Sequence, residues 1–407
     1  MPESVHDLLA RAAALDAADA LSAHRDAFVH VDEVRAYLDG NSLGRPLRRT
    51  RESLASFVDE VWAARLIRAW DEGWFDTPTE LGDTIGRVAL GAAPGQMVVA
   101  DSTTVLIYKL LRAAVDARPG RDEVVLDTDN FPTDRFVAEG VAAERGLTLR
   151  WITPGPDGVT PALVREVVGP RTAVVLVSQV DYRSAHLADV PGITAVAHEA
   201  GALVMWDLCH SAGVVPIELD RYQVDLAVGC TYKYLNGGPG APAFAYLATR
   251  HQGSLQQPVQ GWMGAADPFA MGERYEPAPG VRQLVSGTPP VVGMLPMRDM
   301  LTLVEEAGLD AIRAKSVALT EFAIEVHDAL LAPRGVTLAS PRDASVRGGQ
   351  VTLEHDDFAR VVPELWRQGV VPDFRPPRGL RVGLSPLSTS FREVLTGLRA
   401  VADEVDA

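Results

Sequence analysis

The sequence is poor in several kinds of residue, and each shortage excludes a class of protein. Of its 407 residues only Cys209 and Cys230 are cysteines, which excludes the disulfide framework of small secreted domains. Only 38 Lys and Arg stand against 54 Asp and Glu, and a formal net charge of −16 argues against a nucleic-acid partner. No apolar run approaches the roughly 18 to 20 residues of a membrane span, and no charged and apolar leader opens the chain. We therefore expect a cytoplasmic protein that binds neither membrane nor nucleic acid.

Lysine is also scarce, and this narrows the candidates for amine chemistry. It occurs only at Lys109, Lys233 and Lys315, so 35 of the 38 basic residues are arginine. Lys109 and Lys315 fall within helical patterns, where an ordinary surface lysine is expected. Lys233 instead follows a predicted buried strand and lies between two tyrosines, although a loop lysine reaching to the surface would also fit there.

The apolar pattern that is present predicts an α/β fold. From about residue 50 to 290, helical segments alternate with short β-branched runs, which is typical of a mostly parallel sheet covered by helices on both faces. The expected strands are Met97–Ala100, Glu123–Asp127, Ala173–Val180, Ala202–Asp207 and Val224–Cys230, and the helices between them include Leu163–Val168 and Val190–Glu199.

The two ends of the chain show different patterns. Apolar residues at helical spacing predict an N-terminal helical arm from Pro2 to about Phe28, followed by a structured loop. Beyond Pro290 we expect a smaller α+β domain. It begins with a long helical stretch from about Met294 to Leu331 and ends with a helix from about Ser390. The strands expected between them are Thr337–Ala339, Gly349–Glu354 and Leu380–Leu384. The expected division is therefore an arm over residues 1–45, a large domain over 46–290 and a small domain over 291–407.

Polar residues follow three of the predicted strands, at the edge where an open α/β sheet binds its ligands. Asp101-Ser102-Thr103-Thr104 opens a helix, which provides an anion site or only a helix cap. Asp207 ends a buried strand and His210 follows it; a turn cap and an ordinary core histidine remain the alternatives.

Taken together, these residues match the needs of pyridoxal phosphate. A hydroxyl-rich helix N-terminus binds the phosphate, a carboxylate such as Asp207 keeps the pyridine nitrogen protonated, and Lys233 forms the Schiff base. Each signal alone is weak, but the ordered set predicts a pyridoxal phosphate enzyme. We expect no metal.

The same residues resemble a known family. WDLCHSAG at residues 206–213 and GCTYKYLNGGPGAP at 229–242 are similar to the core of kynureninase, a fold-type I pyridoxal phosphate enzyme. The resemblance extends in order through YLDGNSLG (37–44), FPTD (131–134), YRS (182–184), GW (261–262), GTPP (287–290) and LRVGLSPL (380–387). It implies an aspartate aminotransferase-like fold, with a mostly parallel sheet of seven strands and a smaller C-terminal α+β domain.

The resemblance also implies roles for individual residues. Lys233, Tyr232 and Asp207 would be catalytic, with Arg381 binding the substrate α-carboxylate. Further substrate contacts would come from Asn41, Ser42 and Asp71. The cofactor would be held by Thr103, Thr104, Phe131, Thr133, Asp134, Ser178, Asp207, His210, Tyr232 and Lys233, with Phe131 stacked on its ring. Trp262 and Thr288 would reach the cofactor of the neighbouring subunit, which implies a homodimer.

Some positions depart from the family pattern. Members usually carry histidine where this chain has Ala265, often tyrosine at Ser388, asparagine at Leu106 and Asp71, and glycine at Ala185. Most of these positions are expected on the substrate side, so the cofactor set is intact and the aryl pocket is altered. This leaves open whether the substrate is kynurenine, 3-hydroxykynurenine or another γ-keto α-amino acid, and whether the pathway is tryptophan breakdown.

The implied reaction is hydrolytic cleavage of the Cβ–Cγ bond. Lys233 removes the α-proton, water adds to the γ-carbonyl, and an anthranilate and L-alanine leave, with Tyr232 a candidate acid. A cysteine desulfurase or selenocysteine lyase would need a thiol on a mobile loop, whereas Cys209 and Cys230 both precede the lysine at strand ends. An aminotransferase, epimerase or other lyase of this fold, and a cofactor-binding regulator, are the remaining alternatives; Cys209 is expected only to fill a small core position.

Overall fold

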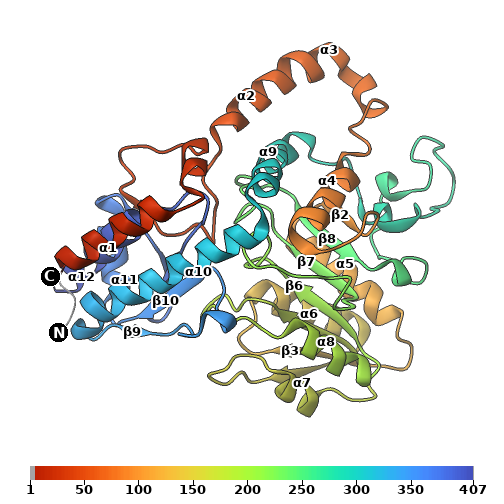
Figure 1. Ribbon diagram of the computed structural model, residues 1–407. Coiled ribbons are helices and arrows are strands. Elements are labelled where there is room, and N and C mark those ends of the chain that lie inside the picture. Colours follow the sequence, from red (N-terminus) through yellow and green to blue (C-terminus); the bar gives the residue numbers. More distant parts are fainter. Residues whose placement is uncertain (1–4, 407) are drawn as a thin grey trace.

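A seven-stranded sheet lies at the centre of the larger lobe in the computed structural model, which describes residues 5–406 (Figure 1). Its strands in spatial order are β2 (Met97–Ala100), β8 (Ala243–Leu247), β7 (Leu226–Gly229), β6 (Leu203–Asp207), β5 (Thr172–Ser178), β3 (Glu123–Asp127) and β4 (Thr148–Ile152). Neighbours from β7 to β4 run parallel, and β8 runs antiparallel to both β7 and β2. The predicted fold class, including the seven strands, is confirmed.

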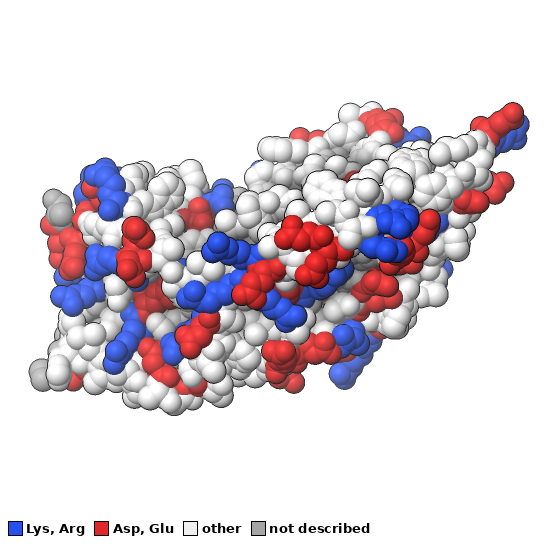
Figure 2. Space-filling view, turned by 90° about the horizontal axis from the view of Figure 1, so that it is seen from above, with Lys and Arg blue, Asp and Glu red and all other residues white. Residues whose placement is uncertain are grey.

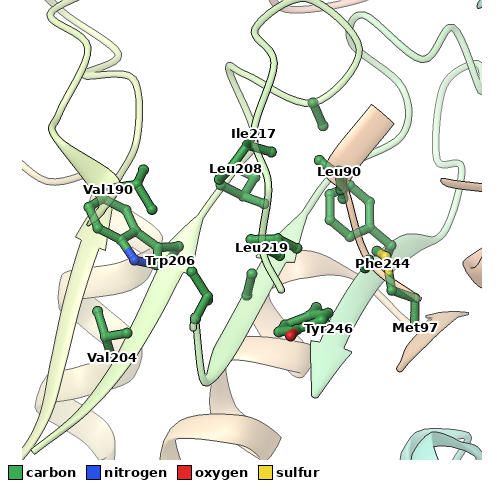
Figure 3. Close-up of a cluster of buried hydrophobic side chains, with 14 of the residues drawn as sticks. Leu90, Met97, Val190, Val204, Trp206, Leu208, Ile217, Leu219, Phe244 and Tyr246 are labelled. Atoms are coloured by element: carbon green, nitrogen blue, oxygen red, sulfur yellow. The ribbon is translucent and has the colours of Figure 1, made fainter. Parts of the chain in front are cut away.

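Alternate residues of each strand pack into separate apolar cores on the two faces of the sheet. In β6, Val204 and Trp206 belong to one core and Leu203 and Met205 to the other. Figure 3 shows the first core, where Trp206 of β6 lies in the same cluster as Phe244 and Tyr246 of β8. By the same alternation, the side chain of Asp207 points to the face of the sheet on which Met205 lies.

Helices cover both faces of this sheet. On the face of Met205, apolar residues of α5 (Thr103–Asp116) and α6 (Pro132–Arg145) join the core. The opposite face is covered by α4 (Thr77–Ile85), α7 (Pro161–Val167), α8 (Val190–Glu199) and α9 (Val291–Ala307).

The smaller lobe has its own sheet and its own core. An antiparallel sheet contains, in spatial order, β12 (Asp373–Arg375), β13 (Gly379–Gly383), β10 (Gln350–Glu354) and β9 (Thr337–Leu338). Beside it, β1 (Ala36–Tyr37) pairs in parallel with β11 (Val370–Val371). The core also takes in α1 (Val5–Ala18), α10 (Leu309–Val326), α11 (Phe358–Arg367) and α12 (Phe391–Val405).

The structure differs from the sequence prediction in a few elements. The long helix expected from about Met294 to Leu331 is two helices, α9 and α10, because Gly308 between them has a φ of +77°. Strands β4 and β8 and helix α11 were not predicted; β4 is a partly exposed edge strand, and β8 contains no β-branched residue. The predicted N-terminal helix begins at Val5, and its residues 2–4 lie outside the described part of the chain.

An arm projects beyond the body of the molecule (Figure 1). It consists of α2 (Arg48–Ser56), a π-helical turn (Phe57–Trp62), α3 (Ala63–Arg65) and a 3-10 turn (Leu66–Trp70). Several large apolar side chains of this arm are exposed, with Ile67 at 77% and Trp62 at 51%. On the face shown in Figure 2, basic and acidic side chains are interspersed. Within residues 5–406, none of the helices has the length and apolar character to cross a bilayer.

Candidate active site

The predicted site residues meet at the carboxyl edge of the large sheet. Strands β5, β6 and β7 run parallel, so their final residues lie at one edge. Ser178 and Asp207, which end β5 and β6, are paired in register and point to the face that α5 covers. The N-terminus of α5 and the loop after β7, which carries Lys233, complete the edge.

These elements enclose a cavity of about 130 Å³. Its walls are Ser102, Thr103, Thr104, Phe131, Thr133, Asp134, Ser178, Tyr182, Asp207, Cys209, His210, Tyr232, Lys233, Ala241 and Ala243. Ten of the predicted cofactor residues are therefore brought together, although they come from five separate segments of the chain.

Lys233 lies in this cavity with only 8% of its surface exposed. Its Nζ is 3.1 Å from His210 Nε2, 5.9 Å from the centre of the Phe131 ring and 6.0 Å from that of the Tyr232 ring. Burial and the charge of Lys233 lower the pKa of His210 well below its ordinary value. The imidazole is therefore neutral and can accept a hydrogen bond from the lysine amine.

The loop that carries Lys233 is fixed by the N-terminal segment. The backbone N–H of Gly44 donates to Tyr232 O at 2.8 Å, and Asn236 Nδ2 donates to Arg45 O at 2.7 Å. A Cβ at position 44 would lie 2.5 Å from Lys233 O, so only glycine permits this approach. The motif at residues 37–44 thus supports the lysine loop.

Two buried carboxyl groups face the lysine. Asp207 Oδ1 accepts a hydrogen bond from Cys209 N at 2.7 Å, and the whole residue is 5% exposed. Asp134 is 1% exposed, and no donor among the described residues reaches its Oδ2. Burial and the neighbouring Asp207 raise the pKa of Asp134 well above its ordinary value. Asp134 therefore holds a proton more readily than an ordinary aspartate.

Hydroxyl groups of the first turn of α5 also line the cavity. Ser102 caps α5, since its Oγ accepts a hydrogen bond from Val105 N at 3.4 Å, and Thr103 and Thr104 form the first turn. The helix N-terminus adds partial positive charge and unpaired N–H groups. The cap and the anion site, which the sequence left as alternatives, are therefore compatible.

The donor set fits pyridoxal phosphate. A near-buried primary amine, a carboxyl pair with an unpartnered oxygen and a hydroxyl-lined helix N-terminus lie around one cavity. They correspond to the aldehyde, the ring nitrogen and the phosphate of that cofactor.

Other predicted residues lie outside the cavity. Arg381 is 1% exposed; it donates to Asp373 Oδ2 at 2.7 Å, to Tyr182 O at 3.0 Å and to Ser42 Oγ at 2.8 Å. Asn41 is fully buried and donates to Gln350. Asp71, Trp262 and Thr288 are exposed, and Trp262 lines a separate open cavity.

The positions that depart from the family pattern are dispersed. Leu106 is fully buried in the apolar core under α5, and Ser388 is buried at 1% exposure, so their expected place on the substrate side is not supported. Ala185 adopts a φ of +66°, a conformation that favours glycine. Ala265 lies beside Trp262 in the open cavity.

Two wall residues were missed as site residues. Tyr182 packs edge-on against Phe131, with ring centres 5.1 Å apart. Cys209 opens to the cavity, and its Sγ lies 3.9 Å from Thr103 Oγ1. No strand pattern marked Cys209, because it lies in the turn that follows β6. The expectation that Cys209 only fills the core is therefore wrong.

Comparisons with known proteins show which family the chain is similar to. A family model described as the kynureninase C-terminal domain matches residues 312–401. A kynureninase of Pseudomonas fluorescens is 38% identical over 401 residues, covering 97% of this chain and 94% of its own. A kynureninase of Burkholderia pseudomallei (strain 1106a) is 39% identical over 402 residues, covering 97% and 95%.

Solved structures show the same fold at lower identity. The cystine C-S lyase C-DES in complex with cysteine persulfide matches with a TM-score of 0.80 and 18% identity, covering 91% of this chain and 98% of its own. A cysteine desulfurase from Thermococcus onnurineus NA1 matches with a TM-score of 0.75 and 17% identity, covering 92% and 95%.

Proposed function

Because the chain belongs to the kynureninase family, we propose that the cavity beside Lys233 is the site where it cleaves kynurenine. The protein is a pyridoxal phosphate-dependent hydrolase that acts on kynurenine. The observation that carries the site assignment is that Lys233 and Asp207, from the ends of two parallel strands, line one cavity with the N-terminus of α5.

The wall residues divide into three groups toward the cofactor. Lys233 Nζ would hold its aldehyde, Asp207 would hold a proton on its ring nitrogen, and the hydroxyl groups of Thr103 and Thr104 would bind its phosphate. Bound pyridoxal phosphate supplies a cationic ring that withdraws electrons from the substrate carbons next to the amino group. Phe131 would cover the ring, since it lines the cavity 5.9 Å from Lys233 Nζ.

Two residues would move protons. Lys233 would remove the α-proton through its free amine, and neutral His210 keeps a hydrogen-bond acceptor next to it. Burial raises the pKa of Tyr232 above its ordinary value, so its phenol stays protonated at neutral pH and can donate a proton to the departing alanine. Water would attack the γ-carbonyl of the substrate to release an anthranilate.

Arg381 would bind the substrate α-carboxylate. Its guanidinium is buried and donates to the backbone of Tyr182, a wall residue of the cavity. Asp373 and Ser42 hold the same guanidinium in place, which is the fixed fork that a carboxylate requires.

We also propose a homodimer whose subunits share their sites. An apolar groove beside the arm is lined by Phe57, Trp62, Trp70, Trp74, Pro289, Pro290, Val291, Val292 and Gly293. A second copy would bury this groove, and Thr288, next to it in the chain, would then reach the neighbouring cofactor.

The two cysteines are free thiols, which supports a cytoplasmic location.

A spectrum of the purified protein, followed by addition of L-kynurenine or 3-hydroxy-L-kynurenine, tests the assignment. We expect a visible cofactor band that Lys233→Ala abolishes, with release of alanine and an anthranilate from at least one substrate. Lys315→Ala is the control, because Lys315 lies in the small lobe on α10. A band without turnover of either compound would contradict kynurenine cleavage in this cavity.

A further inference from the structure

Lys109 is buried although the sequence places it in an ordinary helix. It lies two turns into α5 and has no exposed surface, so the expected surface lysine is wrong. Its Nζ donates to the carboxylate of Asp101 and, at 2.6 Å, to Leu284 O. A buried ammonium group is costly to desolvate, and an apolar residue of similar size is often as stable. The pair therefore needs an explanation other than stability.

Asp101 stands directly before the hydroxyl-lined turn. It joins the end of β2 to the Ser102 cap of α5, and its φ of +45° is in the left-handed region, which aspartate tolerates better than most residues. Its carbonyl accepts a hydrogen bond from Ala243 N at 3.1 Å. The carboxylate of Asp101 is thus fixed one residue away from Ser102, where a phosphate would bind.

A carboxylate at this position would repel a phosphate unless its charge were neutralised. The N-terminus of α5 attracts anions through its N–H groups, and a free negative charge beside it would oppose that attraction. Lys109 supplies the opposite charge in direct contact with Asp101.

We propose that Lys109 is a positioning residue for the cofactor phosphate: it neutralises the charge of Asp101 beside the turn that leads to Thr104. This inference rests on the proposed position of the phosphate at the N-terminus of α5. It does not require Lys109 to touch the cofactor, because Lys109 is absent from the cavity wall. It assigns a role to the second of the three lysines of the chain.

The third lysine provides a matched control. Lys315 on α10 is 6% exposed, and its Nζ lies 2.7 Å from Asp19 Oδ2. This pair is also buried, but it lies in the small lobe and contributes nothing to the cavity wall. Replacing either lysine by methionine removes the same charge from the same kind of environment.

The test measures the affinity of the cofactor-free, full-length protein for pyridoxal phosphate and for pyridoxal, which lacks the phosphate. We expect Lys109→Met to weaken pyridoxal phosphate binding by about tenfold or more, the loss typical of one charge-assisted contact. Pyridoxal binding should stay within about twofold, since its contacts are remote from the Asp101 charge. Lys315→Met should leave the affinity for both compounds unchanged.

The reciprocal substitution separates charge balance from plain structure. Asp101→Asn retains the shape of the side chain and the left-handed backbone but leaves the ammonium group of Lys109 without its counter-charge. The affinity for pyridoxal phosphate should therefore stay the same or rise. If the ion pair only supported the structure, both Lys109→Met and Asp101→Asn would weaken the binding of pyridoxal phosphate. An equal loss in Lys109→Met and Asp101→Asn would overturn the inference, as would an equal loss for both compounds in Lys109→Met.

Failure of the underlying phosphate site gives a different result. If that site is wrong, the wild-type protein binds pyridoxal as tightly as pyridoxal phosphate, and Thr103→Ala has no effect on either affinity. If Thr103→Ala weakens only pyridoxal phosphate binding while Lys109→Met does not, the site stands and the role of Lys109 fails. If Lys109→Met does not fold, Asp101→Asn alone tests the proposal. A fall in its affinity for pyridoxal phosphate would contradict the charge argument.

Discussion

At the scale of single residues, the two carboxyl groups of the cavity have different tasks because their surroundings differ. Asp207 accepts a backbone hydrogen bond from Cys209, which stabilises a charged carboxylate. Asp134 has an oxygen without a donor, and burial and Asp207 raise its pKa. The hydrogen bond from Cys209 N therefore fixes Asp207, whereas Asp134 holds a proton more readily than an ordinary aspartate.

This difference predicts unequal effects of the same substitution. Asp134→Asn replaces a carboxyl group whose raised pKa disfavours the charged form by a neutral amide of the same shape, so we expect kcat to fall by less than about tenfold. Asp207→Asn removes the charge that would hold the ring proton and should lower kcat by about 100-fold or more. Steady-state rates and the cofactor band of each variant provide the measurement. Equal losses in the two variants would contradict the assignment.

A second buried carboxylate governs stability in acid. Asp225 accepts hydrogen bonds from Val204 N, His198 and His251 and is paired with Arg250. Burial by itself would raise the pKa of Asp225, but these hydrogen bonds outweigh burial and hold it well below the ordinary range. A depressed pKa contributes stability that is complete above the unfolded value of about 4 and is lost as the pH falls toward the folded value.

Asp225→Asn should therefore lower the free energy of unfolding at pH 7 by about 3 kcal/mol, the cost of breaking a buried pair. The difference from the wild type should shrink as the pH falls below about 4, because Asp225 of the unfolded wild-type chain then binds a proton that the folded chain does not yet bind. Urea denaturation at several pH values measures this difference in the free energy of unfolding. Asp122→Asn, at an exposed pair with Arg171, should have no measurable effect. If the difference in unfolding free energy between the wild type and Asp225→Asn did not change with pH, the charge of Asp225 would not be the source of the stability.

At the scale of elements, the break between α9 and α10 depends on one glycine. Gly308 has a φ of +77°, and a Cβ there would meet no atom within 4 Å. Any cost of a side chain at this position therefore comes from the backbone alone. The periodicity on both sides of Gly308 is helical, which is why the sequence predicts one long helix.

Gly308→Ala should destabilise the protein by about 1–3 kcal/mol through this backbone strain. Gly140 in α6 is the matched control, since a Cβ there also meets no atom within 4 Å and its backbone is helical. Gly140→Ala should stabilise by about 0.5–1 kcal/mol. Thermal unfolding of both variants gives the comparison. Stabilisation by both substitutions would mean that the break does not need a left-handed residue.

At the scale of the whole molecule, the proposed homodimer accounts for the exposed apolar arm and the exposed Trp262. The proposed homodimer would bury the arm and bring Trp262 to the neighbouring site. One consequence is that each site combines residues of two chains.

Mixing two inactive variants tests this arrangement. In a mixed dimer of Lys233→Ala and Trp262→Ala chains, one of the two sites has both wild-type residues. Random exchange should therefore restore about a quarter of wild-type activity, because half of the dimers are mixed and each has one intact site. Sedimentation of the separate variants checks that they remain dimers. No recovery after subunit exchange would mean that Trp262 serves its own chain or no site.

The sequence by itself determined the features that are local. Strand periodicity and the polar residue that ends each strand predicted where Asp207 and Lys233 lie on the sheet. The hydroxyl groups before an amphipathic run predicted the start of α5. These signals lie within a few residues of the feature they specify, so they can be interpreted without knowing the fold.

Only the tertiary structure decided which charged groups are buried and what they contact. Lys109 has the pattern of a surface lysine, but Asp101 and the distant Leu284 enclose it. Asp134 and Asp207 come from different elements, and burial together with the neighbouring Asp207 raises the pKa of Asp134. Burial, pKa and ion pairing depend on neighbours that are far apart in the chain, and no local pattern specifies those neighbours.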